Sequence, residues 1–105
     1  MASAFTEAVV SLLSSVPAGR VVTYGGLARA AGSPRAARQV VRILHSQSSS
    51  RGLPWHRVLN SAGRVALTDP EGAELQRALL ASEGVVFEAT GAVDLERFEW
   101  RFPPP

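Results

Sequence analysis

The sequence predicts a mainly α-helical domain that carries a small β hairpin. Several stretches repeat apolar residues at helical spacing, each with a capping residue before it or a glycine after it. A later stretch places two short apolar runs on either side of a Ser-Ala-Gly turn, which predicts the hairpin. Because the chain has 105 residues and no internal repeat, we expect one domain over residues 1–105 with one main site.

The first two expected helices cover residues 3–15 and about 24–31. Ser3 is a plausible N-cap for the first helix, which repeats apolar residues at helical spacing. Pro17 and Gly19 end that helix, and a turn with a short extended piece follows. Thr23 can cap the second helix, which we expect to end near Gly32.

Residues 33–46 predict a third helix with two different faces. Its Ser-Pro start is typical of a helix N-terminus. At 100° per residue, one face is basic and the other apolar. The basic face holds Arg35, Arg38, Arg42 and His45, and the apolar face holds Ala37, Val40, Val41 and Leu44. Two short helices of which the second presents arginines match a helix-turn-helix with a recognition helix.

The remaining elements complete a winged arrangement. Residues 46–52 are expected to form a flexible polar loop, and residues 53–67 a hairpin or wing. A further helix is expected from Asp69-Pro70 to Gly84, followed by a possible short strand at residues 85–89. The aromatic residues of the tail, after residue 94, are expected to pack back on the domain.

Composition excludes several kinds of site. The chain has no cysteine, which excludes disulfides, thiolate metal sites and a cysteine nucleophile. Its two histidines lack acidic neighbours at ligand spacing, so we expect neither a metal nor a cofactor. No apolar stretch approaches the ~20 residues that cross a bilayer. We therefore expect no membrane partner and a cytoplasmic location.

Charge is distributed unevenly along the chain. Residues 1–64 hold eight arginines and one acid, whereas residues 65–105 hold three arginines and eight acids. Every basic residue is arginine, whose planar group suits bidentate contacts with phosphates and bases. The first half therefore predicts a polyanionic partner. The alternative is that the arginines form a solvated face with no partner, and that arginine replaces lysine only because the genome is rich in GC.

The stretch "LPWHRVL", residues 53–59, is the strongest candidate for a site. His56 could act as a general base and Arg57 could bind an anion. Trp55 can stack on a ligand but cannot act as a nucleophile. A base without a nucleophile leaves open that His56 is a hydrogen-bonded structural side chain.

Three motifs together resemble the C-terminal DNA-binding domain of the O6-alkylguanine-DNA alkyltransferases. They are "TYGGLARAAGSPRAARQV", "LPWHRV" and "LLASEGV", and the resemblance covers roughly residues 3–87. In that family the active-site motif is Pro-Cys-His-Arg-Val, so Trp55 stands where the alkyl-accepting cysteine is expected. Gln47-Ser48 replaces the family's Asn-Pro. With the family's extra N-terminal domain also missing, the chain resembles the non-catalytic alkyltransferase-like proteins.

The resemblance implies a role for particular residues. Arg38 would enter the duplex and fill the gap left by an extruded nucleotide, and Tyr24 would help to rotate that nucleotide. The pocket for the lesion would be formed by Tyr24, Pro54, Trp55, His56, Arg57, Val58 and Glu83. Candidate phosphate contacts are Arg35, Arg42, Arg51 and Arg64, and candidate lid residues are Arg64 and Thr68.

The implied function is recognition without catalysis. We expect a monomer that binds O6-alkylguanine in double-stranded DNA by nucleotide flipping, leaves the alkyl group in place and flags the lesion for nucleotide excision repair proteins. On DNA it would lie at the bacterial nucleoid. One alternative is a winged-helix regulator that reads sequence. Another is an enzyme in which His56 activates water, although no metal or cofactor is expected to assist it.

Overall fold

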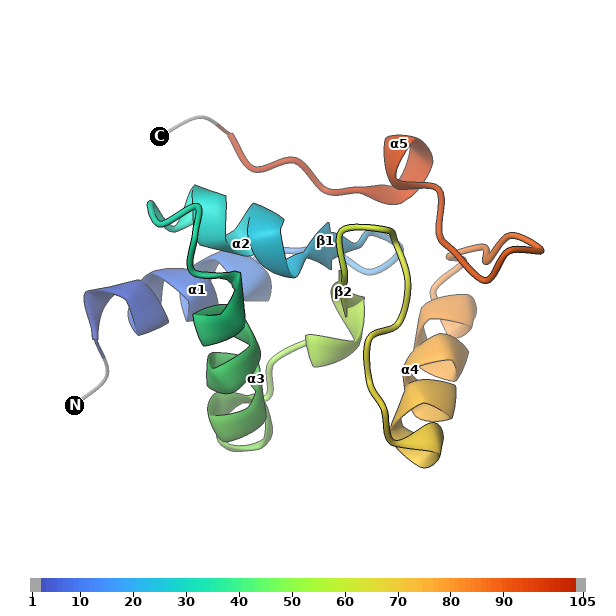
Figure 1. Cartoon of the computed structure of the whole chain (residues 1–105), viewed down its shortest axis with the longest axis horizontal. Coiled ribbons are helices and arrows are strands. Elements are labelled where there is room, and N and C mark those ends of the chain that lie inside the picture. The colour runs from blue at the N-terminus through green and yellow to red at the C-terminus, as the bar shows by residue number, and fades with distance from the viewer. Residues whose placement is uncertain (1–2, 104–105) are drawn as a thin grey trace.

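The computed structural model describes residues 3–103, and the short sheet at its centre separates two groups of helices (Figure 1). Helices α1, α2 and α3 lie on one side of this sheet, and α4 and α5 lie on the other. Helices dominate, as the sequence predicts. In chain order the elements are α1 (Ala4–Ser14), β1 (Val22–Thr23), α2 (Tyr24–Ala30), α3 (Ala37–Arg51), the 3-10 turn η1 (Trp55–Arg57), β2 (Val58–Leu59), α4 (Pro70–Ser82) and α5 (Leu95–Phe98).

Three of the helices begin at the caps that the sequence predicts. Ser3 Oγ accepts the Thr6 N–H at 3.1 Å, and Thr23 Oγ1 accepts the Gly26 N–H at 2.9 Å. Asp69 caps α4 in the same way. Each side chain satisfies one of the N–H groups that a helix N-terminus leaves without a partner. These helix starts are therefore confirmed.

Two apolar clusters form the core. The first joins the inner faces of α1, α2 and α3, and the second joins β2, α4 and the tail. Phe98 is buried in the second cluster, and Trp100 and Phe102 pack against the first, so the expected packing of the tail aromatics is confirmed. Within residues 3–103, no helix is long and apolar enough to span a membrane.

The expected hairpin is wrong. Strand β2 pairs in parallel with β1, with Val22 opposite Val58, and no strand returns over residues 64–68. The turn exists, because the Asn60 N–H donates to the Arg64 carbonyl at 3.0 Å, but pairing ends there. Val58 and Leu59 are both buried, as is typical of a strand covered on both faces, whereas a wing would alternate buried and exposed residues.

The third helix differs from its prediction at both ends. It begins at Ala37, because residues 33–36 form a turn closed by an Ala36 N–H to Ser33 carbonyl bond of 3.0 Å. It continues through the serine run to Arg51, where the left-handed Gly52 ends it at φ 61°. The expected flexible loop at residues 46–52 is therefore mostly helix. Residues 85–89 likewise hold no strand, only an isolated bridge between Phe87 and Val93.

Candidate nucleic-acid interface

The outer face of α3 carries exposed arginines. Helices α2 and α3 are joined by a tight turn in which Gly32 adopts φ 91°. Arg38 and Arg42 are exposed on α3, Arg35 is exposed in the turn before it, and none of the three has an ion-pair partner among residues 3–103. These arginines line a shallow groove of about 580 Å³. The groove is open to a large anionic ligand.

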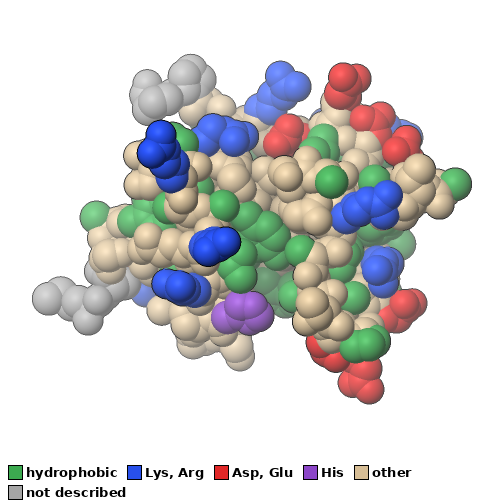
Figure 2. Space-filling view, in the orientation of Figure 1, with side chains coloured by type: hydrophobic (Ala, Val, Ile, Leu, Met, Phe, Trp, Pro, Cys, Tyr) green, Lys and Arg blue, Asp and Glu red, His purple; other side chains and the backbone are tan. Residues whose placement is uncertain are grey.

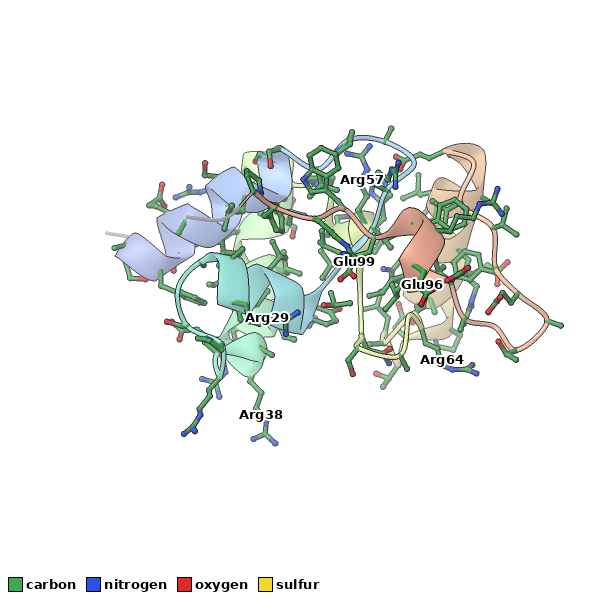
Figure 3. The ribbon with its side chains drawn as sticks, turned by 90° about the horizontal axis from the view of Figure 1, so that it is seen from above. Arg29, Arg38, Arg57, Arg64, Glu96 and Glu99 are labelled. Carbon is green, nitrogen blue, oxygen red and sulfur yellow. The ribbon has the colours of Figure 1, made fainter. Side chains whose placement is uncertain are left out.

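The uneven charge of the sequence becomes a spatial division. On the face shown in Figure 2, arginine side chains gather over the α2–α3 side, and acidic side chains together with further arginines lie over the α4–α5 side. Hydrophobic surface lies between them. Figure 3, which views the protein from above, shows Arg38 projecting from α3 toward the side that faces the reader in Figure 2. The arginines and the hydrophobic surface therefore belong to the same face.

A cavity of about 660 Å³ lies beside α3. This volume falls within the range of pockets that bury small organic ligands. Burial raises the pKa of the Tyr24 hydroxyl, so this group stays protonated and can donate a hydrogen bond. The lining residues come from α2, α3, η1, α4 and the segments next to them: Tyr24, Val41, Leu44, His45, Ser48, Ser49, Gly52, Leu53, Trp55, Leu67, Asp69 and Gln76.

Two polar groups of the cavity were not found from the sequence. Ser48 Oγ is buried and has no hydrogen-bond partner within the described part of the chain, so it is available to a ligand. Gln76 is 1% exposed, and its Nε2 donates to the His56 carbonyl at 3.1 Å and to the Val58 carbonyl at 2.9 Å. Gln76 thus fixes the segment that carries Trp55. The available signal was an amide between Ala73 and Leu80 on the buried face of α4.

Behind the cavity, Glu83 binds three segments of the chain. His56 Nε2 lies 2.8 Å from Glu83 Oε2, and Arg57 donates to the same carboxylate from Nε at 3.0 Å and from Nη2 at 2.7 Å. The Gly19 N–H donates to Oε1 at 3.1 Å, and Arg57 Nη1 donates to the Val16 carbonyl at 2.9 Å. Five donor–acceptor contacts therefore tie η1 and the end of α4 to the turn after α1.

The Glu83 carboxylate is held in its charged form. Hydrogen bonds from Arg57 chiefly, and then from His56 and Gly19, lower its pKa from 4.5 to about 2, against the opposing effect of burial. A carboxylate that accepts this many hydrogen bonds is a poor proton acceptor. The cluster is therefore suited to holding the backbone in place rather than to acid–base chemistry.

The structure separates the expected pocket residues into two groups. Tyr24 and Trp55 line the cavity. His56 and Arg57 face Glu83 instead. Val58 is fully buried within β2, because its strand is covered on both faces. The half-buried Pro54 precedes η1 without lining the cavity. Of the seven residues expected around the lesion, the structure thus places two on the cavity wall and most of the others in its support.

The arginines expected to contact phosphates and the expected lid residues differ in their surroundings. Arg51 forms an ion pair with Glu7 at 2.8 Å, so it is engaged within the protein. Arg64 projects to the same side as Arg38 but from the opposite end of the molecule (Figure 3). Neither Arg64 nor Thr68 lines the cavity, whereas Leu67 and Asp69 from the same segment do. No group of three His, Cys, Asp or Glu residues that could hold a metal occurs within residues 3–103.

Comparisons with known proteins agree on one family. A family model described as 6-O-methylguanine DNA methyltransferase, DNA binding domain, matches residues 4–85. A DNA base-flipping protein of Escherichia coli K12 is 44% identical over 98 residues, which cover 93% of this chain and 75% of that one. Alkyltransferase-like protein 1 of Schizosaccharomyces pombe is 33% identical, covering 92% of this chain and 94% of that protein.

A solved structure extends the similarity to three dimensions. The crystal structure of Schizosaccharomyces pombe Atl1 in complex with damaged DNA containing O6-carboxymethylguanine superposes with a TM-score of 0.80 at 33% identity. The superposition covers 96% of this chain and 99% of that one. The fold described above, and not only its helix pair, is therefore similar to that of the DNA-bound protein.

Proposed function

Because the chain belongs to the family of the 6-O-methylguanine DNA methyltransferase DNA-binding domain, we propose that it binds O6-alkylguanine in duplex DNA by nucleotide flipping and leaves the alkyl group in place. The single observation that carries the proposal is Trp55 on the wall of the cavity, and the resemblance implies that this indole stands at the position of the family's alkyl-accepting cysteine. An indole can stack on an extruded base but cannot accept the alkyl group as a thiolate does.

Arg38 is the residue that would replace the extruded nucleotide. Its guanidinium projects from the recognition helix and has no ion-pair partner among residues 3–103. A flat cation can stack within the base column and donate hydrogen bonds to the base left without a partner. Flipping costs a few kcal/mol and costs least where base pairing is already damaged. Alkylation at O6 would therefore favour capture.

Tyr24 joins the DNA surface to the cavity. It is the first residue of α2 and lines the cavity, so its hydroxyl can reach the flipped nucleotide. Arg35 and Arg42 lie on the same basic groove and would contact backbone phosphates, which position the protein without reading sequence. His56, Arg57 and Glu83 would support the wall that carries Trp55, as the hydrogen bonds of Glu83 suggest.

The geometry speaks against the two alternative functions. A regulator that reads sequence from α3 has no use for a large cavity beside that helix. An enzyme that activates water through His56 would need this ring at the cavity, but the ring faces the Glu83 carboxylate and is not among the lining residues. The arginines of α3 would suit any DNA-binding protein, so it is Trp55 on the cavity wall that favours lesion recognition.

Hand-over to repair completes the proposal. A protein that binds a lesion without removing it needs other proteins to complete the repair. We propose that nucleotide excision repair proteins are these partners. Residues 1–105 would act as one monomeric unit in the cytoplasm, at the nucleoid when DNA is bound. The acidic α4–α5 side would remain exposed to a repair protein while the basic side contacts DNA (Figure 2).

The test is a pair of binding titrations. One duplex contains a single O6-methylguanine and the other contains guanine at the same position, both at about 150 mM salt because phosphate contacts depend on ionic strength. We expect the lesion duplex to bind at least about ten-fold more tightly, since its weakened pair costs less to open. Equal affinities would refute lesion recognition, and a preferred sequence in random-site selection would favour the regulator.

A further inference from the structure

The wall of the cavity carries one fixed negative charge and no arginine. Among its lining residues, Asp69 is the only carboxylate and His45 the only group that can become positive. The rest of the wall consists of apolar residues, glycine, hydroxyl groups and the Gln76 amide. Any charge on a bound adduct would therefore be exposed mainly to the field of Asp69.

The position of Asp69 is fixed by the helix that it caps. Its Oδ2 accepts the Gly72 N–H at 3.0 Å, which holds the carboxylate at the N-terminus of α4. The helix dipole contributes about half a positive charge there. Glu71 adds a second negative charge in the first turn of α4. The net charge at this end of α4 is therefore negative.

Arg42, Arg51 and Arg64 do not line the cavity and face other groups. Arg64 lies close to Gly91, because a Cβ on that glycine would be 3.2 Å from its Nη1. Arg42 lines the groove at the start of α3 rather than the cavity, and Arg51 pairs with Glu7 at 2.8 Å. Asp69 itself has no ion-pair partner within residues 3–103. No ion pair within the described residues therefore neutralises its charge at the cavity.

We propose that Asp69 is a specificity-determining residue that makes this protein favour neutral O6-alkylguanines over the anionic O6-carboxymethylguanine. The inference rests on the proposed function, because it assigns the charge class of adduct that the same cavity accepts. Specificity here comes from repulsion of the wrong ligand rather than from a new attractive contact. The carboxymethyl group would bring a second carboxylate into the cavity that Asp69 lines, and the two like charges would repel each other.

The test compares two adducts of the same shape. Duplexes carry either O6-carboxymethylguanine or its neutral isostere O6-carbamoylmethylguanine at one position, and their affinities are measured in competition. We expect the neutral adduct to bind about five-fold more tightly, a modest ratio because Asp69 is exposed. Because both duplexes have the same phosphates, the ratio of the two affinities does not depend on the general attraction between the protein and DNA.

Asp69→Asn isolates the charge of this side chain. Asparagine caps helices as well as aspartate does, so α4 should remain intact, and Asp69→Ser provides a second neutral cap. Both variants should reduce the ratio to below about two-fold by improving carboxymethyl binding. The matched control is Asp94→Asn, because Asp94 caps α5 by accepting the Glu96 N–H at 3.1 Å but does not line the cavity. That variant should keep the five-fold ratio.

Each contrary result has a distinct meaning. Equal binding of the two adducts by the unmodified protein, a ratio that survives both Asp69 substitutions, or the same shift in Asp94→Asn would overturn the role of Asp69. In those cases a preference of either lesion duplex over an undamaged duplex would leave the proposed function standing. If neither lesion duplex binds more tightly than undamaged DNA, both the function and the inference fall.

Discussion

Arg57 and Arg38 show that the protein uses the same guanidinium group in two opposite ways. Arg57 lies inside the molecule, with hydrogen bonds to both Glu83 oxygens and to the Val16 carbonyl (Figure 3). Arg38 projects from α3, and no ion-pair partner for it occurs in the described part of the chain. The first arginine is satisfied by the fold, and the second is available to a ligand.

This difference separates stability from binding. A largely buried charge must be paired, and removing its partner leaves it desolvated at a large cost. An exposed arginine is solvated in the folded and the unfolded protein alike, so its substitution should change stability little. We therefore expect substitutions in the Glu83 cluster to change the free energy of unfolding, and substitutions on the outer face of α3 to change DNA affinity.

The largest effect is expected from Glu83→Gln. The variant leaves the Arg57 guanidinium, whose side chain is only 16% exposed, without its carboxylate. We expect a loss of about 3 kcal/mol in the free energy of unfolding, measured by urea denaturation. Glu74→Gln is the matched control, because Glu74 pairs with Arg77 at 3.9 Å on the surface and is 82% exposed. A loss of similar size in the control would show that Glu83 has no special role.

The same carboxylate predicts how stability depends on pH. The pKa of Glu83 is about 2 in the folded protein and 4.5 when unperturbed, so its stabilisation is complete above about pH 5 and is lost as the pH falls toward 2. We expect this group to account for about 3 kcal/mol of the acid destabilisation. Urea titrations from pH 6 to pH 3 should show a shallower fall for Glu83→Gln. Parallel curves for the two proteins would contradict the assignment.

Arg38→Ala should lower the affinity for DNA and leave the free energy of unfolding almost unchanged, the reverse of what we expect for Glu83→Gln. Loss of the guanidinium leaves the gap in the duplex unfilled, and we expect lesion affinity to fall about ten- to thirty-fold. The free energy of unfolding should change by less than about 0.5 kcal/mol, since Arg38 is exposed. Anisotropy titrations and urea denaturation on the same preparation measure both quantities. An unchanged lesion affinity would remove Arg38 from the proposed mechanism.

The smallest effects compare two arginines at the edge of the interface. Arg42 lines the basic groove without an ion-pair partner among residues 3–103, whereas Arg51 is engaged by Glu7. We expect Arg42→Ala to weaken binding to damaged and undamaged duplexes alike by about three-fold. The slope of the logarithm of the binding constant against the logarithm of the salt concentration should become less steep by about one, because one phosphate contact is lost. Arg51→Ala should change either affinity by less than about two-fold. A larger loss of affinity for Arg51→Ala than for Arg42→Ala would mean that a DNA phosphate displaces Glu7 from Arg51.

Local rules predicted much of the fold. The caps at Ser3, Thr23 and Asp69 and the glycine after the second helix are set by neighbours within a few residues, and the structure has them where the sequence indicates. The parallel pairing of β2 with β1 depends on residues 36 positions apart, as in Val22 with Val58, and no local pattern encodes it. The serine run continues α3 despite the weak helix propensity of serine, and the helix ends only at the left-handed Gly52.

The candidate site was predictable to a similar extent. The motif around Trp55 and the place of His56 and Glu83 in one site follow from the resemblance, and the structure brings the latter pair to 2.8 Å. Which side of the motif faces the cavity did not follow, because a 3-10 turn at residues 55–57 directs Trp55 one way and Arg57 another. Asp69 was recognised only as a helix cap, and its place on the cavity wall requires the tertiary structure.

The central proposal is that the protein binds the lesion and leaves it chemically intact. The most direct measurement is the intact mass of both partners after prolonged incubation of the protein with excess O6-methylguanine duplex, under conditions where binding has been shown. We expect the protein and the lesion strand to keep their starting masses, since the chain has no cysteine and the indole that we propose at the acceptor position cannot take up the alkyl group. A protein heavier by one methyl group, or a strand that has lost one, would contradict the account.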